Sequence, residues 1–210
     1  MTEQHDAPGV HSVIGVDAGT ATLREADHLI HDLVDRLDLP AGTIACTHLI
    51  RTAERRGTAI SLAVPDGAAA DAAWGPLAAL AAREMSAAGV VLGERVYGPA
   101  ESARAAALAA AEHVHRHSGR AVVFPGVHHL TGSVTVADVL TRAVIDRVTV
   151  LGAPSTGGPG PDPATPVLTR DHVRPEWRDG QLLLALVPAA GGVLAPFEVP
   201  NPTPCCADHA

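Results

Sequence analysis

The sequence has no lysine, very few aromatic residues and only three cysteines. Aromatic residues make up 2% of the chain, which argues against a stacking platform for single-stranded nucleic acid. The 15 basic residues face 23 acidic ones, and the net charge of −8 opposes binding to DNA or to an anionic membrane surface. We therefore expect neither a nucleic-acid partner nor a membrane partner.

Two further absences concern the cellular compartment. Three cysteines, two of them adjacent, do not make a disulfide framework, and this favours a reducing environment. The segment from Met1 to Gly9 is polar and lacks the apolar core of a signal peptide. The chain also lacks a charge-free apolar stretch of about eighteen residues that could span a membrane. We therefore predict a cytoplasmic protein.

The abundant residues predict a core built of small apolar side chains and a surface rich in histidine. Hydrophobic residues make up 47% of the 210 residues, and with so few aromatics the core must be built from Ala, Val and Leu with closely approaching backbones. Protonation of all twelve histidines would change the net charge from −8 to +4. The surface charge should therefore change sign at mildly acidic pH. The main consequence of this change in charge is for solubility, and a role as a pH sensor is a secondary hypothesis.

The segment from Arg120 to Gly152 predicts a strand, a helix and a second strand. Ala121 to Phe124 and Val148 to Leu151 are apolar and β-branched without polar alternation, as in strands buried on both faces. Between them, Thr135 and Asp138 have the spacing of a capping box at the start of an amphipathic helix. Strands and helices alternate from Thr58 onward, so we predict an α/β fold with a mostly parallel sheet and crossover helices.

The N-terminal third predicts further helices. Thr22 and Glu25 form a capping-box pattern, and the polar face of this helix, with Asp27, is interpreted as solvated. The segment from Thr43 to Gly57 is ambiguous, but its apolar positions fit a helical face. The segment from Asp66 to Ala88 reads as a helix interrupted near Gly75-Pro76.

The C-terminal third predicts an antiparallel β-meander, from Val167 to Arg170, Gln181 to Val187 and Val193 to Val199. Asp179-Gly180 suits the tight turn before the second of these strands. The predicted organisation is a flexible arm (1–19), the α/β domain (20–152), a Pro/Gly-rich loop (153–165), the meander packed on the main domain (166–199) and a Pro-rich Cys/His tail (200–210).

His128 and His129 follow a predicted buried strand. Open parallel sheets bind ligands beyond the carboxyl ends of their strands, so this loop is a candidate site. The tail PNPTPCCADHA carries Cys205, Cys206 and His209, and a Cys–His spacing of three suits one turn of chain around a metal ion. We predict that the tail folds back and that these five residues bind zinc, or Cu(I) if thiolates dominate.

An open coordination position on such a metal would support a hydrolase or lyase acting on a small molecule. Asp171 and His172 lie in a dense polar connection and are the candidate proton carriers. A Ser-His-Asp triad needs no sequence proximity, and Ser133 and Ser155 are its candidate nucleophiles.

Three other features of the chain lead to different expectations. The Ala-rich helices permit close packing between chains, which favours a homo-oligomer and a non-catalytic binding or regulatory protein. The adjacent thiols of Cys205 and Cys206 are compatible with a redox sensor. His113 and His117, one turn apart at the end of a predicted helix, lack the glutamate of a metalloprotease motif and are expected to be structural.

Overall fold

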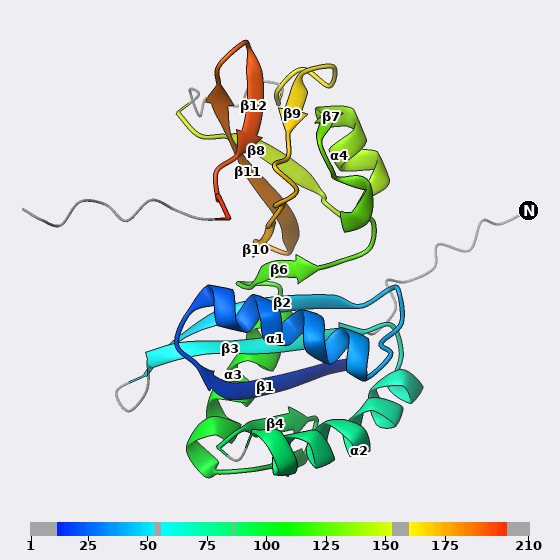
Figure 1. Ribbon diagram of the computed structural model, residues 1–210, viewed down its shortest axis with the longest axis vertical. Coiled ribbons are helices and arrows are strands. Elements are labelled where there is room, and N and C mark those ends of the chain that lie inside the picture. Colours follow the sequence, from blue (N-terminus) through cyan, green and yellow to red (C-terminus); the bar gives the residue numbers. More distant parts are fainter. Residues whose placement is uncertain (1–11, 53–55, 86, 153–159, 201–210) are drawn as a thin grey trace, which may run out of the picture. The chain divides into compact units, whose positions relative to one another are not determined.

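The computed structural model describes residues 12–52, 56–85, 87–152 and 160–200. In these residues the chain forms four α-helices, one short 3₁₀ helix and twelve strands (Figure 1). They divide into two compact units. The N-terminal unit extends to Pro125 and also includes Glu176–Gly180, whereas the C-terminal unit consists of Gly126–Pro175 and the residues from Gln181 onward.

The N-terminal unit has a seven-stranded sheet in the order β5-β4-β1-β3-β2-β6-β10, and its strand pairings are antiparallel. In chain order its elements are β1 (Ser12–Thr20), α1 (Leu23–Arg36), β2 (Ile44–Arg51), β3 (Arg56–Val64), α2 (Gly67–Glu84), β4 (Gly89–Leu92), β5 (Arg95–Tyr97), α3 (Ala100–Val114), β6 (Arg120–Val123) and β10 (Glu176–Arg178).

The prediction of a mostly parallel sheet is wrong, and the topology of the N-terminal unit gives the reason. The element sequence β1-α1-β2-β3-α2-β4 with strand order β4-β1-β3-β2 is the split β-α-β arrangement. Each helical crossover skips one position in the sheet. The skipped position is filled by an antiparallel strand, β3 between β1 and β2, and β1 between β3 and β4. Alternation of strands and helices therefore did not imply parallel neighbours.

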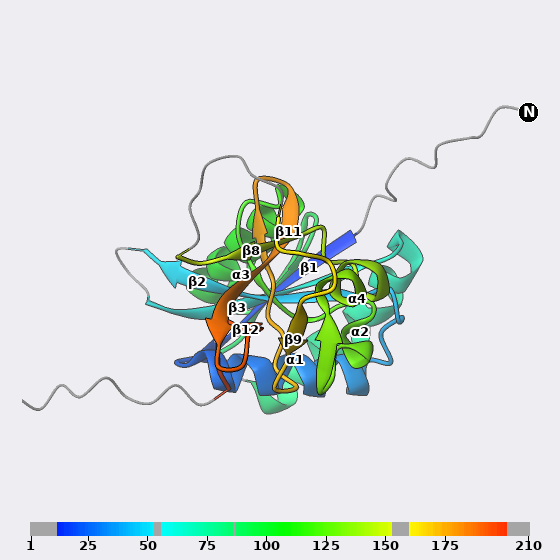
Figure 2. The same ribbon diagram turned by 90° about the horizontal axis from the view of Figure 1, so that it is seen from above.

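Helices cover both faces of this sheet. Helices α1 and α2 lie on one face and α3 lies on the other, as Figures 1 and 2 show from two directions. The main hydrophobic core lies beneath α1 and α2 and includes Ile14, Ile30, Leu62 and Leu77. Smaller clusters beneath α3 are formed largely by alanines.

Glycine lets α3 approach the sheet closely. A Cβ atom at Gly15 in β1 would lie 2.0 Å from the carbonyl oxygen of Ala106, and one at Gly89 in β4 would lie 2.2 Å from the backbone nitrogen of Ala103. Such distances leave no room for a side chain. The expectation of closely approaching backbones is thus confirmed for α3 and strands β1 and β4.

Local predictions in this unit had mixed outcomes. The capping box of Thr22 and Glu25 is confirmed at the start of α1. The helical interpretation of Thr43 to Gly57 is wrong, because Ile44–Arg51 is the strand β2. Its first five residues are all buried, so they show no strand-like alternation of polarity. Helix α2 is continuous through Pro76, and the predicted interruption is also wrong.

The C-terminal unit contains the 3₁₀ helix η1 (Val127–His129), β7 (Ser133–Thr135), α4 (Val136–Arg142), β8 (Arg147–Val150), β9 (Pro166–Leu168), β11 (Gln181–Ala189) and β12 (Val193–Pro196). The Thr135–Asp138 capping box is confirmed at the start of α4. Strands β11 and β12 are antiparallel, as predicted. The three-stranded meander is wrong, because β9 pairs with β12 in parallel and β8 is the strand that pairs with β11, also in parallel.

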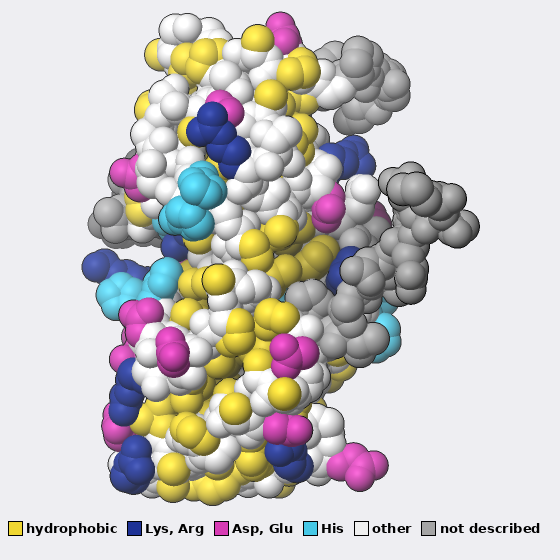
Figure 3. All heavy atoms as spheres, turned by 90° about the vertical axis from the view of Figure 1, so that its right-hand side faces the viewer, with side chains coloured by type: hydrophobic (Ala, Val, Ile, Leu, Met, Phe, Trp, Pro, Cys, Tyr) yellow, Lys and Arg dark blue, Asp and Glu magenta, His cyan; other side chains and the backbone are white. Residues whose placement is uncertain are grey.

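Residues 1–11, 153–159 and 201–210, which include much of the predicted arm, loop and tail, lie outside the described residues. None of the helices within the described ranges has both the length and the apolar character to cross a membrane. In the lower half of Figure 3, which shows the N-terminal unit, acidic and basic side chains are interspersed among hydrophobic ones. Neither sign of charge dominates the described residues on that face.

Candidate functional site

The residues of the predicted metal site are only partly described. His128 and His129 form most of η1, are exposed, and have ring centroids 3.9 Å apart. Cys205, Cys206 and His209 lie outside the described residues. Within the described ranges, no three His, Cys, Asp or Glu side chains are placed to share a metal ion. The zinc site therefore stays a prediction, and its premise of a parallel-sheet edge is gone because β6 pairs with antiparallel neighbours.

Asp171 and His172 each have a structural partner in the C-terminal unit. The Asp171 carboxylate accepts a hydrogen bond from the backbone N–H of Gly132 at 2.8 Å, and Asp171 itself has a positive φ of 52°. His172 Nε2 lies 3.0 Å from a carboxylate oxygen of Glu198. These contacts fasten a turn to the loop before β7 and to the segment after β12. The role of the two residues as proton carriers stays a prediction.

A different group of polar side chains comes together in the N-terminal unit, between the sheet and α3. Strand β2 contributes His48 and strand β3 contributes Ser61, while Glu112 and His113 come from the last turn of α3. Glu112 Oε2 lies 2.9 Å from His48 Nδ1, and His48 Nε2 lies 2.8 Å from Ser61 Oγ. Ser61 Oγ is also 2.7 Å from His113 Nδ1. We call Glu112, His48, Ser61 and His113 the histidine network.

The secondary structure explains why these side chains meet. In β2, Cys46, His48 and Ile50 alternate with residues of the opposite face, and Ile50 packs with alanines of α3. His48 therefore points toward α3. Its register partner in the neighbouring strand β3 is Ala59, and Ser61 lies two residues further along the same strand. Gly119 follows α3 with a φ of 124°, and a Cβ atom there would lie 2.7 Å from the His48 ring. The chain thus closes directly over the imidazole.

The network has the connectivity of a carboxylate–imidazole–hydroxyl triad, but its serine is inaccessible. Ser61 is 0% exposed, and His48 and His113 are 2% and 5% exposed. A substrate atom must come within about 3 Å of a nucleophile, and the described conformation has no opening to Ser61. The second imidazole also occupies a position where a substrate would have to lie. The arrangement can hold and move protons, and it does not present a nucleophile.

One tautomer assignment satisfies every contact in the network, and it follows from hydrogen bonding. His48 Nδ1–H donates to the Glu112 carboxylate, and Ser61 donates its hydroxyl proton to His48 Nε2. The Nδ1–H of His113 then donates to Ser61 Oγ. Reversing the two hydrogen bonds of Ser61 passes the Nδ1 proton of His113 through the hydroxyl to His48 Nε2, and a proton taken up on His113 Nε2 replaces it. The serine can thus serve either imidazole as donor, but only one of them at a time.

Glu112 is the negative charge of the network. The hydrogen bond from His48 lowers the pKa of the Glu112 carboxyl below its usual value of 4.5, against the opposing effect of partial burial. Ser118 Oγ, which donates a hydrogen bond to the same carboxylate oxygen at 2.6 Å, lowers this pKa further. The carboxylate is therefore ionised at neutral pH.

Replacement of Glu112 by glutamine should change how stability depends on acid. Because the pKa of Glu112 is lower in the folded state, its ionised form stabilises folding above pH 4.5, and this contribution is lost as pH falls through the folded value. We expect the free energy of unfolding of the parent protein to fall more steeply than that of E112Q below pH 4.5. Urea denaturation at several pH values tests this. Parallel curves for the two proteins would contradict it.

Trp177 of β10 covers the network. The Trp177 ring centroid lies 5.9 Å from that of His113. The guanidinium carbon of Arg116 lies over the same Trp177 ring, 4.9 Å from its centroid. The backbone N–H of Trp177 donates to the Gly119 carbonyl at 2.9 Å. Cys46 lies nearby, where burial raises the pKa of its thiol although the Trp177 indole and the Arg120 charge act to lower it. The thiol is therefore neutral.

A second buried polar contact lies on the opposite face of the sheet. Arg120 in β6 makes a two-pronged ion pair with Asp27 in α1, at 2.6 and 3.1 Å. Arg120 Nη1 also lies 3.4 Å from Thr47 Oγ1. Asp27 is 7% exposed, so its interpretation as part of a solvated helix face is wrong. This ion pair fastens α1 to the strand next to β2.

The histidine network is not predictable from local sequence patterns. The pattern places His113 at the end of a helix, but nothing local connects it with a serine 52 positions away. The helical prediction for the segment that contains His48 hides the face on which this residue lies, and the burial of Glu112 depends on how α3 packs. A strand reading of β2 would have put His48 on the same face as Cys46 and Ile50. That was the one available signal.

Comparison with known proteins adds no assignment, since no protein-family model, no curated protein and no solved structure matches this chain. The fold and the site define its class in structural terms alone. The N-terminal unit is an extended split β-α-β domain that encloses a proton-holding network.

Proposed function

We propose that the chain is a regulatory protein whose N-terminal unit responds to mild acid through the histidine network. The supporting observation is that a single serine hydroxyl bridges two buried imidazoles. Histidine is the side chain that ordinarily changes charge between pH 5 and 8. On proton uptake, β10 leaves β6 and exposes Trp177, while the rest of the unit stays folded.

The proton count explains why acid disturbs this arrangement. The Glu112 carboxylate, which accepts the hydrogen bond from His48 Nδ1, offsets one positive charge in the network. A second positive charge would lie close to the first, because the ring centroids of His48 and His113 are 6.3 Å apart. Both imidazoles then donate to Ser61, and its hydroxyl proton needs a new acceptor. Like charges at this distance in a buried site repel strongly.

The surroundings of the network make Trp177 the element that responds. The charged or titratable groups facing it are Glu112 from α3, Cys46 from β2 and Arg116 from the segment after α3, while the Arg120 charge acts on Cys46 from the opposite face of the sheet. Arg116 already stacks on Trp177, so a charged His113 would add a second cation to the same ring. The residues beside Trp177 in β10, Glu176 and Arg178, form an ion pair with each other at 2.8 Å. Strand β10 has only three residues and a single register pair with β6, Glu176 opposite Arg120, so few backbone contacts hold it to that strand.

Tryptophan fluorescence should report this response. In a W74F background Trp177 is the only tryptophan of the chain, because the sequence contains two. We expect its emission to shift to longer wavelength and weaken between about pH 7 and pH 5, as the buried indole becomes exposed to water. The H113N variant keeps a polar atom near the position of Nδ1 but cannot take up the proton, and it should show no such transition.

The matched control is H117N, which removes an exposed histidine four residues from His113. It should retain the transition. Circular dichroism at pH 8 establishes that each variant is folded. The proposal fails if the W74F protein shows no spectral change down to pH 5, or if folded H113N shows the same transition as the W74F protein.

We place this protein in the cytoplasm, on the support of the odd cysteine count and of Cys46, a free and buried thiol. The alternative proposal is the metal-dependent hydrolase or lyase suggested by His128, His129 and the Cys/His tail. No contact among the described residues favours it over the regulatory proposal.

A further inference from the structure

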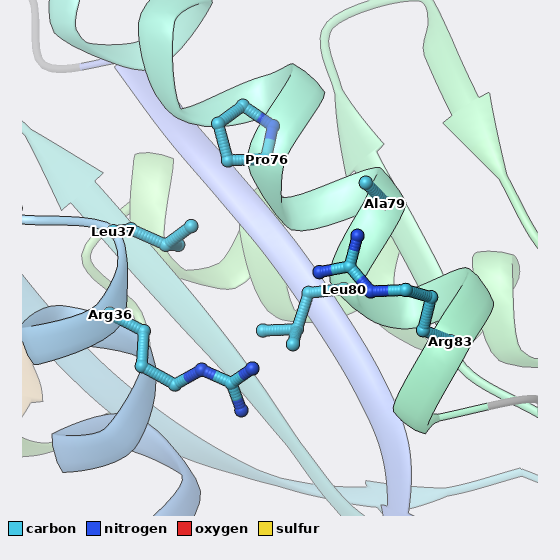
Figure 4. Close-up of a pocket in the computed structure, with 6 residues that line it drawn as sticks. All are labelled: Arg36, Leu37, Pro76, Ala79, Leu80 and Arg83. Carbon is cyan, nitrogen blue, oxygen red and sulfur yellow. The ribbon is translucent and has the colours of Figure 1, made fainter.

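A small groove lies between α1 and α2 in the N-terminal unit, on the face of the sheet opposite the histidine network. It has a volume of about 310 Å³ and is lined by Arg36, Leu37, Pro76, Ala79, Leu80 and Arg83 (Figure 4). This volume is at the lower end of the range for small-molecule sites.

The floor of the groove is apolar. Leu80 is 4% exposed and belongs to the main core, against which Leu37 also packs. Pro76 lies inside α2 and presents its ring to the groove without a backbone N–H. These side chains offer an aliphatic surface to a ligand and no hydrogen-bonding group.

The two arginines extend over this floor from opposite helices, and Figure 4 shows both guanidinium groups near Leu80. They differ in their partners. Arg36 makes a two-pronged ion pair with Glu84, both contacts at 2.7 Å, and also contacts Asp32 at 3.3 Å. The Arg83 guanidinium forms no hydrogen bond or ion pair within the described part of the chain. Arg83 is therefore the group with donors available to a ligand.

We infer that this groove binds a small monocarboxylate with a short aliphatic body. A guanidinium matches a carboxylate with two parallel hydrogen bonds, so Arg83 would hold the charged end while Leu37, Pro76 and Leu80 contact the aliphatic part. The charges favour a single negative charge on the ligand. Arg36 and Arg83 are balanced by Asp32 and Glu84, so a multiply charged phosphate would be repelled by Glu84.

Titration of the full-length protein with sodium octanoate at pH 7.5 tests this inference, with isothermal calorimetry and two-dimensional amide NMR as readouts. This pH avoids any acid response of the histidine network, so the outcome does not depend on the regulatory proposal. We expect a dissociation constant on the order of 1 mM, as for a ligand of about ten heavy atoms in an open site. Shifted amide signals should come from α1 and α2.

Three variants locate the binding. R83Q removes the guanidinium that would bind the octanoate carboxylate, and it should weaken octanoate binding about tenfold. A79F fills the groove from an exposed position of α2 and should abolish binding, even if R83Q is tolerated. R24Q removes an exposed arginine of α1 that does not line the groove, and it should bind like the parent protein.

Two further ligands separate the charged and apolar contributions. Octan-1-ol has the apolar body without the charge, and inorganic phosphate has charge without the body. Both should bind at least tenfold more weakly than octanoate. The inference is overturned if either binds as well as octanoate, if octanoate does not bind, or if R83Q and A79F leave octanoate binding unchanged.

Discussion

Replacing Asp27 by alanine is expected to lower the free energy of unfolding of the N-terminal unit by about 3–5 kcal/mol. The substitution leaves the Arg120 guanidinium, which is in a side chain only 9% exposed, without the carboxylate that it contacts at 2.6 and 3.1 Å. An uncompensated buried charge costs more than the ion pair contributed. Urea denaturation followed by tryptophan fluorescence measures the change, because Trp74 and Trp177 both belong to this unit.

The matched control is D35A, at an exposed position of the same helix, which should change stability by less than about 0.5 kcal/mol. The double variant D27L/R120M replaces both charges with apolar groups and should recover most of the loss, because no buried charge remains. A D27A protein as stable as D35A would contradict the prediction. So would a double variant that is no more stable than D27A.

Replacing Gly15 by alanine is expected to cost about 3 kcal/mol, at the upper end of the range for overpacked cores. The new Cβ atom would lie 2.0 Å from the Ala106 carbonyl oxygen and 3.2 Å from the Ala110 Cβ. Because the closest atom belongs to the backbone of α3, no side-chain rotation relieves the clash. The whole helix must move away from β1, which loosens its packing on β4 as well.

G67A is the matched control for this substitution. Gly67 begins α2 with an ordinary φ, and an added Cβ would be in normal contact, 3.7 Å from Ser12 Oγ. We expect this variant to be unchanged or more stable by up to about 1 kcal/mol, since alanine restricts the unfolded chain. Equal thermal midpoints for G15A and G67A would show that α3 does not depend on this close approach.

The elements with strong local signals were predictable from sequence. The capping boxes at Thr22 and Thr135 fixed the starts of α1 and α4, because side-chain and backbone groups three residues apart satisfy each other. Strand order was not predictable in this way. Whether a crossover skips a position depends on which strand fills it, and β3 occupies the position between β1 and β2 by pairing over the length of β2.

The site was harder to predict than the fold because its members are joined only by packing. Ser61 looks like an ordinary polar residue in an apolar strand, and its two imidazole partners come from β2 and α3. Asp27 has a helical position that reads as solvated until Arg120 of β6 is known to lie against it. In both cases the burial of a polar group is set by a partner far along the chain.

Strand β10 has a consequence for synthesis of the chain. Translation completes residues 12–125 well before Glu176–Gly180, yet these five late residues belong to the same compact unit. A nascent chain released up to Pro125 would therefore hold the histidine network without the indole that covers it. The N-terminal unit can be completed only after Trp177 has left the ribosome. A chaperone that binds incompletely folded chains can therefore act on this unit between the synthesis of Pro125 and that of Gly180.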